Sequence, residues 1–195
     1  MKNREVRLIL LVSSLSLLLL TAWGGLRKSM AGQPGPINAT TIPFIPANDL
    51  QFIDAIIPHH QAAIQMAQIE RQKGARDDVK ALAEGIVASQ MLEIGILQNA
   101  RQELAGSPTV PAPPDDPHID SDIAQLQQAS GLQVDELFLE HMIAHHANAI
   151  SLSHRALPNL QRADVKQVAL NAYNSQAHEV GDMAEMRGKM PSPSP

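Results

Sequence analysis

Two stretches of the chain have similar sequences: FIDAIIPHH at residues 52–60 and FLEHMIAHH at residues 138–146. The second stretch begins 86 residues after the first, and the similarity continues at this offset without a gap. The further matches are Ala63-Ile64 with Ala149-Ile150, Asp78-Val79-Lys80 with Asp164-Val165-Lys166, Ser89-Gln90 with Ser175-Gln176, and Glu93 with Glu179. Similarity at one constant offset indicates a duplicated structural unit.

Each copy of the repeat has the length and pattern of a helical hairpin. In the first copy we predict helices over residues 48–73 and 77–105, with Gly74 and Gly106 as stops. In the second copy we predict helices over residues 135–157 and 162–187, with a turn at Pro158 and Asn159. Aromatic residues make up only 3% of the chain, so aliphatic residues and Met must form the core, which favours helices over sheets.

A long connection, rich in Pro and Asp at its start, joins the two hairpins between residues 106 and 134. It is too long for a tight turn, and a short helix around residues 122–129 fits within it. The most economical assembly is an all-α, ferritin-like four-helix bundle with a long crossover between its second and third helices. This domain is expected to span residues 48–190, with its two repeats at 48–106 and 134–190.

The N-terminus has the pattern of an export signal. Basic residues precede an apolar run at residues 8–23, and Ser29-Met30-Ala31 fits a cleavage site. Residues 1–31 are therefore expected to be a signal peptide or an uncleaved anchor, followed by an extended linker at 32–47 and, after the domain, a disordered tail at 191–195. The protein is expected to be periplasmic or secreted, in contact with a membrane only through this N-terminal segment.

Charge and composition restrict the partners. The formal net charge is −5, although the expected leader carries Lys2, Arg4, Arg7, Arg27 and Lys28 against the single acid Glu5, so the remainder is more acidic still. An acidic body argues against nucleic-acid binding, which depends on Lys and Arg at phosphates. The chain has no Cys, so any soft metal ion must be held by Met and His.

The paired histidines, His59-His60 and His145-His146, occupy equivalent positions of the two repeats. Each pair is followed by Gln and then Glu, at Gln90 and Glu93 in the first copy and at Gln176 and Glu179 in the second. Adjacent residues on a helix point about 100° apart, so one histidine of each pair can face the core while the other faces outward or sideways. These groups either bind metal or hydrogen-bond one another as structural pairs.

The second repeat is richer in soft ligands than the first. His141 and His145, like Met142 and His146, are spaced i, i+4 and could chelate one ion from one helix face. Thioether and imidazole groups suit Cu(I) and Ag(I) better than Mg(II), Ca(II) or structural Zn(II). The leading candidate ligands are Met142, His145, His146, Met183 and Met186, followed by His141, His178, Glu179, His59, His60 and Glu93.

The two HH segments, each with its later Gln-x-x-Glu, resemble the bacterial CopM-like copper-binding family, also called domain of unknown function 305. The resemblance covers about residues 49–186. It implies a four-helix fold and extracytoplasmic copper and silver binding in metal resistance. Two features depart from the family pattern: no Met- and His-rich segment stands in the leader, and Leu97 stands at the position of Met183 in the first repeat.

These observations favour a non-enzymatic copper(I) chaperone or buffer, with silver(I) as a mimic of the ion and a copper transporter or efflux component as a partner. Two alternatives remain open. One is a helical interaction module with structural histidine pairs and no metal. The other is a ferritin-like di-metal oxidase, although no Glu is followed three residues later by His, as that class requires.

Overall fold

The computed structural model describes residues 44–112 and 116–190. Its helices are α2 (Asp49–Lys73), α3 (Asp77–Ala105), α4 (Pro117–Gln128), α5 (Leu132–Ala156) and α6 (Ala163–Gly188), with a 3₁₀ turn at Leu157–Asn159 between α5 and α6. The described ranges contain no strand, which confirms the all-α prediction. The signal or anchor, most of the linker and the C-terminal tail lie outside the described residues.

The helix ends follow local signals in the sequence. Asn48 caps α2 by accepting a hydrogen bond from the backbone N–H of Gln51, and α2 then runs unbroken through Pro58 to Gly74. Gly106 ends α3 with a φ of 73°, a left-handed conformation that favours glycine. Both helices have the predicted bounds to within one residue.

Two helices begin earlier than predicted. The helix in the connection, α4, starts at Pro117 because the Asp116 side chain accepts hydrogen bonds from the backbone N–H groups of His118 and Ile119. α5 starts at Leu132, directly after Gly131, whose φ of 61° turns the chain into the helix. The structure therefore places helix in part of the chain that the sequence pattern left as connection.

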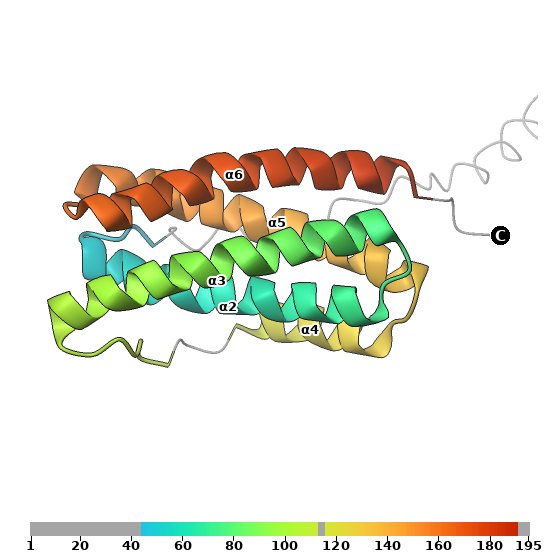
Figure 1. Cartoon of the computed structure of the whole chain (residues 1–195), viewed down its shortest axis with the longest axis horizontal. Coiled ribbons are helices and arrows are strands. Elements are labelled where there is room, and N and C mark those ends of the chain that lie inside the picture. The colour runs from blue at the N-terminus through green and yellow to red at the C-terminus, as the bar shows by residue number, and fades with distance from the viewer. Residues whose placement is uncertain (1–43, 113–115, 191–195) are drawn as a thin grey trace, which may run out of the picture. The chain divides into compact units, whose positions relative to one another are not determined.

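The helices form a bundle of two hairpins (Figure 1). α2 packs with α3 and α5 with α6, while α2 also packs on α5 and α3 on α6. Around the bundle the order is therefore α2, α3, α6, α5, with α4 packed on the α2–α5 face. None of the described helices has the length and apolar character needed to cross a bilayer.

The apolar interior is divided into two clusters. One contains Phe52 and Ile56 from α2, Leu97 from α3, and Ala149 and Val168 from the second hairpin, together with their neighbours. The other is built from the opposite ends of the same helices and contains buried Met66, Met142 and Met183. Between the two, at the middle of the bundle, lie the paired histidines and the glutamines and glutamates of the repeat. We call the cluster around Phe52 and Leu97 the methionine-free cluster. The cluster that contains Met66, Met142 and Met183 is called the methionine cluster.

The two repeats cap one another. The carboxylate of Asp49, at the start of α2, accepts hydrogen bonds from the backbone N–H groups of Gln161 and Arg162 in the other hairpin. Asp135, its equivalent in α5, accepts from the N–H groups of Ala75 and Arg76. These equivalent contacts follow an approximate two-fold symmetry of the bundle. They connect the two hairpins to each other at both ends.

The same symmetry appears in an ion pair within each hairpin. Arg101 donates from Nε to Asp54 Oδ1 at 2.7 Å, and the equivalent Arg187 donates to Glu140 Oε2 at 2.6 Å. The duplication seen in the sequence therefore extends to side-chain contacts, and it places equivalent polar groups opposite one another at the centre.

Candidate metal centre

All four paired histidines lie inside the bundle. His60, His145 and His146 are buried, and His59 is largely so. The helix geometry allowed one histidine of each pair to face outward or sideways, and in the second pair neither faces solvent. In a bundle, a direction 100° away from one neighbouring helix meets another, so adjacent residues can both point inward, toward different helices.

The two histidines of a pair make different contacts. His60 Nε2 lies 2.8 Å from Glu93 Oε2, within its own hairpin, and His146 Nε2 lies 2.7 Å from Glu179 Oε2 in the other. The rings of His59 and His145 instead meet between the hairpins, with centroids 3.7 Å apart and planes tilted by 39°. We call these four histidines, with Gln90, Glu93, Gln176 and Glu179, the histidine layer.

The histidine layer leaves many buried polar atoms without a partner. Within the described structure, His59 and His145 have no hydrogen bond at either ring nitrogen, and His60 and His146 have none at Nδ1. The amide oxygens of Gln90 and Gln176 are also buried and unpartnered. Buried polar groups in proteins nearly always have partners, so a concentration of such atoms in one layer indicates that something else satisfies them.

The histidines between the hairpins are neutral at ordinary pH. Burial, followed by the nearby His60 and His146, lowers the pKa of His59 to about 3. Burial, and then the neighbouring rings of His59, His146 and His60, hold the pKa of His145 well below its ordinary value. Neutral imidazole is the form that coordinates a metal ion, so these rings need lose no proton to do so.

The glutamate contacts match the outer shell of a histidine metal site. A ligating histidine usually binds a carboxylate or carbonyl through one ring nitrogen and the metal through the other. Here Glu93 and Glu179 take the Nε2 positions, which leaves His60 Nδ1 and His146 Nδ1 for a ligand. Among the described residues, no group of three or more His, Asp or Glu side chains is arranged around one ion position.

The candidate methionines lie on one side of the histidine layer. Met142 and Met183 are fully buried in the methionine cluster, and Met186 packs against it partly buried. The methionine cluster also contains Met66 from the first repeat, which was not among the predicted ligands. The soft side chains therefore come from both repeats, and all of them stand at the same end of the bundle.

Two of the predicted histidines, His141 and His178, are not part of the histidine layer. His141 Nδ1 lies 3.3 Å from Asp122 Oδ1 on α4, so one ring nitrogen is engaged by the connection, while its Nε2 is buried and unpartnered in the described structure. His178 is exposed on α6. The structure thus brings together His59, His60, His145 and His146 with Glu93 and Glu179, whereas His141 contacts α4 and His178 is exposed.

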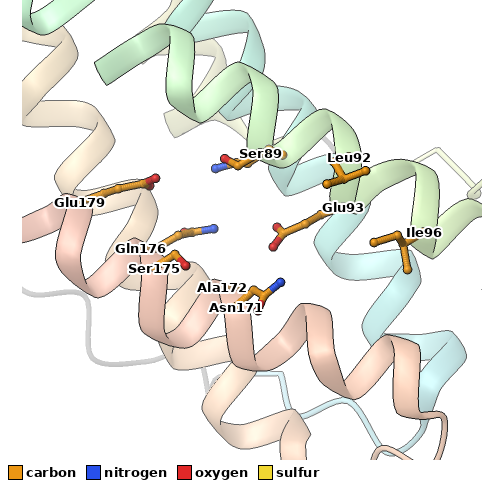
Figure 2. A pocket seen from close by; sticks show the side chains of 10 residues that line it. Ser89, Leu92, Glu93, Ile96, Asn171, Ala172, Ser175, Gln176 and Glu179 are labelled. Atoms are coloured by element: carbon orange, nitrogen blue, oxygen red, sulfur yellow. The ribbon is translucent and has the colours of Figure 1, made fainter. Parts of the chain in front are cut away.

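A pocket between α3 and α6 opens onto the outer side of the histidine layer. It has a volume of about 160 Å³ and its lining includes Gln90, Glu93, Gln176 and Glu179, with Ser89 and Ser175 at equivalent positions. Figure 2 shows the side chains of Glu93 and Gln176 pointing toward one another across this space. The serines were not among the predicted site residues, and the glutamines entered the prediction only as part of the repeated His-His and Gln-x-x-Glu pattern.

Comparison with protein families matches the chain to the domain of unknown function DUF305, over residues 28–101 and 49–187. No curated protein matches the sequence.

Solved structures give several matches. The silver-bound form of CopM is 29% identical, with a TM-score of 0.62, over 72% of this chain and 96% of that one. Its Cu(I)-bound form is 26% identical, with a TM-score of 0.62 and the same coverage. A DUF305 fragment from Deinococcus radiodurans, at 24% identity, covers 76% of this chain and 100% of that one with a TM-score of 0.64, and shares the fold.

Proposed function

The chain belongs to the DUF305 family, and on that premise we propose that it binds copper(I) in the histidine layer between its two hairpins. The similarity to silver- and copper-bound CopM supports a copper-related role at the level of the family. In this chain the proposal depends on one observation. Neutral buried imidazoles from both repeats converge at the centre with their ring nitrogens unpartnered.

The residues of the layer divide into two roles. His59 and His145, with Nδ1 of His60 and His146, are the nitrogen ligands available to an ion. Met142 and Met183, from the adjoining methionine cluster, supply thioethers. Soft sulfur together with imidazole favours Cu(I) and Ag(I) over hard cations, and thioethers do not compete for protons. Glu93 and Glu179 contact the Nε2 atoms of His60 and His146 and so fix the orientation of these two rings.

The biological role that follows is storage or transfer of copper outside the cytoplasm. A protein that holds Cu(I) with neutral ligands and has no Cys suits an oxidising compartment, where a thiolate site would be lost to oxidation. We therefore propose a non-enzymatic chaperone or buffer that is exported by its N-terminal segment and exchanges copper with a transporter or efflux component.

The test is an anaerobic titration of the protein with Cu(I) against a chromophoric chelator of known affinity, with Zn(II) in parallel. The proposal expects saturable Cu(I) binding that Zn(II) does not displace. A His59→Leu, His145→Leu variant should lose it, while the matched change His118→Leu, at an exposed histidine of α4, should not.

A second variant tests the thioethers. Replacing Met142, Met183 and Met186 together with Leu keeps the volume of the core but removes sulfur, and the preference for Cu(I) over Zn(II) should fall. Unchanged binding in this variant would refute a soft site. If the native protein took up no copper at all, the histidine pairs would be structural, and the interaction-module alternative would be favoured.

A further inference from the structure

The histidine layer is enclosed on most sides. The methionine-free cluster and the methionine cluster cover it along the axis of the bundle. The α2–α3 and α5–α6 contacts close the two flanks, and α4 packs on the α2–α5 face. Consistent with this, the side chains of His60 and His146 are 0% exposed. An ion bound there must pass through protein to reach solvent.

The α3–α6 face opens toward the histidine layer. It carries the pocket of about 160 Å³, and the histidine layer contributes both glutamates and both glutamines to its lining. The Glu93 side chain is 11% exposed and that of Glu179 is 22% exposed, while the histidines they contact are fully covered. The two carboxylates therefore connect solvent with the buried rings.

The charge of the pocket suits a cation. Its lining contains two carboxylates, the polar side chains of Ser89, Ser175 and Asn171, and no Lys or Arg. A concave site lined by one sign of charge raises the local concentration of counter-ions. Each carboxylate also stands within hydrogen-bond distance of a histidine, so a cation at the glutamate is one side chain away from a nitrogen ligand.

We propose that this pocket is the passage through which the metal ion enters and leaves the histidine layer, with Glu93 and Glu179 as the first ligands it meets. This inference rests on the proposed function, since it supplies a path for the ion that the layer holds. The two-fold symmetry gives each half of the layer its own glutamate on the shared passage, so one opening serves both.

The experiment uses Ser175→Trp, which places a large side chain at the lining of the pocket on an exposed position of α6. The protein is loaded with Cu(I) and mixed with excess chromophoric chelator, and release is followed in time. We expect release to slow about tenfold or more, while the equilibrium affinity changes less than about twofold. A blocked passage slows entry and release alike, so the ratio of the two rates is preserved.

The matched control is Asn174→Trp. This neighbour is exposed on the same helix but does not line the pocket, so release should stay as in the native protein. A folded Ser175→Trp variant that releases copper at the native rate would overturn the passage and leave the copper site intact. Failure of the native protein to bind Cu(I) would instead refute the proposed function, and the passage with it.

Discussion

His59 and His145 stand at equivalent positions of the two repeats and meet between the hairpins, with ring centroids 3.7 Å apart and ring planes tilted by 39°. Each hairpin contributes one ring, so the proposed site would draw on both repeats. This relationship changes the expectation drawn from the sequence, in which the second repeat was the leading candidate because its soft residues are more numerous.

The first prediction concerns this shared site. His59→Leu and His145→Leu should each weaken Cu(I) binding to a similar extent, by about tenfold or more, since each removes one of two equivalent rings. The measurement is competition with a chelator for Cu(I). A large loss with His145→Leu and none with His59→Leu would place the site in the second hairpin alone.

The same pair predicts how the metal-free protein responds to acid. The pKa of His59 is about 3 in the folded protein against an ordinary value of 6.5. As the pH falls below 6.5 the unfolded chain takes up the proton first, so the stability contributed by the neutral ring is lost progressively toward pH 3. Melting temperatures should therefore fall between pH 7 and pH 5, above the range in which most carboxylates titrate.

The control for this fall is the His59→Leu, His145→Leu variant, which has lost both rings with lowered pKa. Its melting temperature should depend less on pH over the same interval. An equal decline in the native and doubly substituted proteins would show that other groups cause it.

The glutamates behind the histidines should control affinity. Glu93→Leu or Glu179→Leu removes the acceptor that holds one ring, and loss of such a partner typically weakens metal binding about 10- to 100-fold. Glu93→Gln retains an acceptor and should have a smaller effect. Glu136→Leu, an exposed change on α5, is the control, and equal Cu(I) affinities across all four variants would exclude an orienting role.

The cross-capping aspartates should stabilise the assembly of the hairpins. Asp49→Ala leaves the N–H groups of Gln161 and Arg162 without their acceptor, which should lower the free energy of unfolding by about 1–3 kcal/mol in urea titration. Asp77→Ala, at an exposed position in the first turn of α3, tests the charge of a helix start alone and should cost less than about 1 kcal/mol. Equal losses would argue against the capping role.

The fold could be predicted because local sequence signals determine the helix ends and the repeat indicates the duplicated hairpin. Asn48, Gly74 and Gly106 mark helix ends through rules that operate within one turn. The constant offset of the repeat then indicates that two equivalent hairpins pack together. The early starts of α4 and α5 were missed because Asp116 and Gly131 act as single-residue caps in a stretch without clear periodicity.

The site was predicted less completely, for a geometric reason. Sequence spacing tells which residues share a helix face, so it favoured pairs such as His141 with His145. The contact between His59 and His145 depends on how the hairpins pack, and the partner of His141 is Asp122, in a helix that lies outside the repeat. The neutrality of the paired rings depends on burial by both hairpins, which no single segment encodes.

The symmetry is broken at Glu70, whose equivalent in the second repeat is Ala156. Glu70 is fully buried, and within the described structure its carboxyl oxygens accept no hydrogen bond. A Cβ built on Gly74 would overlap Glu70 Oε1 and lie 2.7 Å from Asp135 Oδ1, so the two carboxyl groups meet in the space that this glycine leaves. Burial, and then the neighbouring Asp135, raise the pKa of Glu70 to about 8.

A protonated Glu70 can donate to Asp135, so this acid stabilises the fold in its neutral form. Since its ordinary pKa is 4.5, the contribution is fully present below pH 4.5 and is lost as the pH rises through about 8. Glu70→Gln supplies a donor that cannot ionise. We expect this variant to unfold at the same urea concentration as the native protein near pH 5 and at a higher one at pH 9. A native protein that matched it at pH 9 would show that Glu70 ionises without cost, because Asp135 would then tolerate a second negative charge beside it.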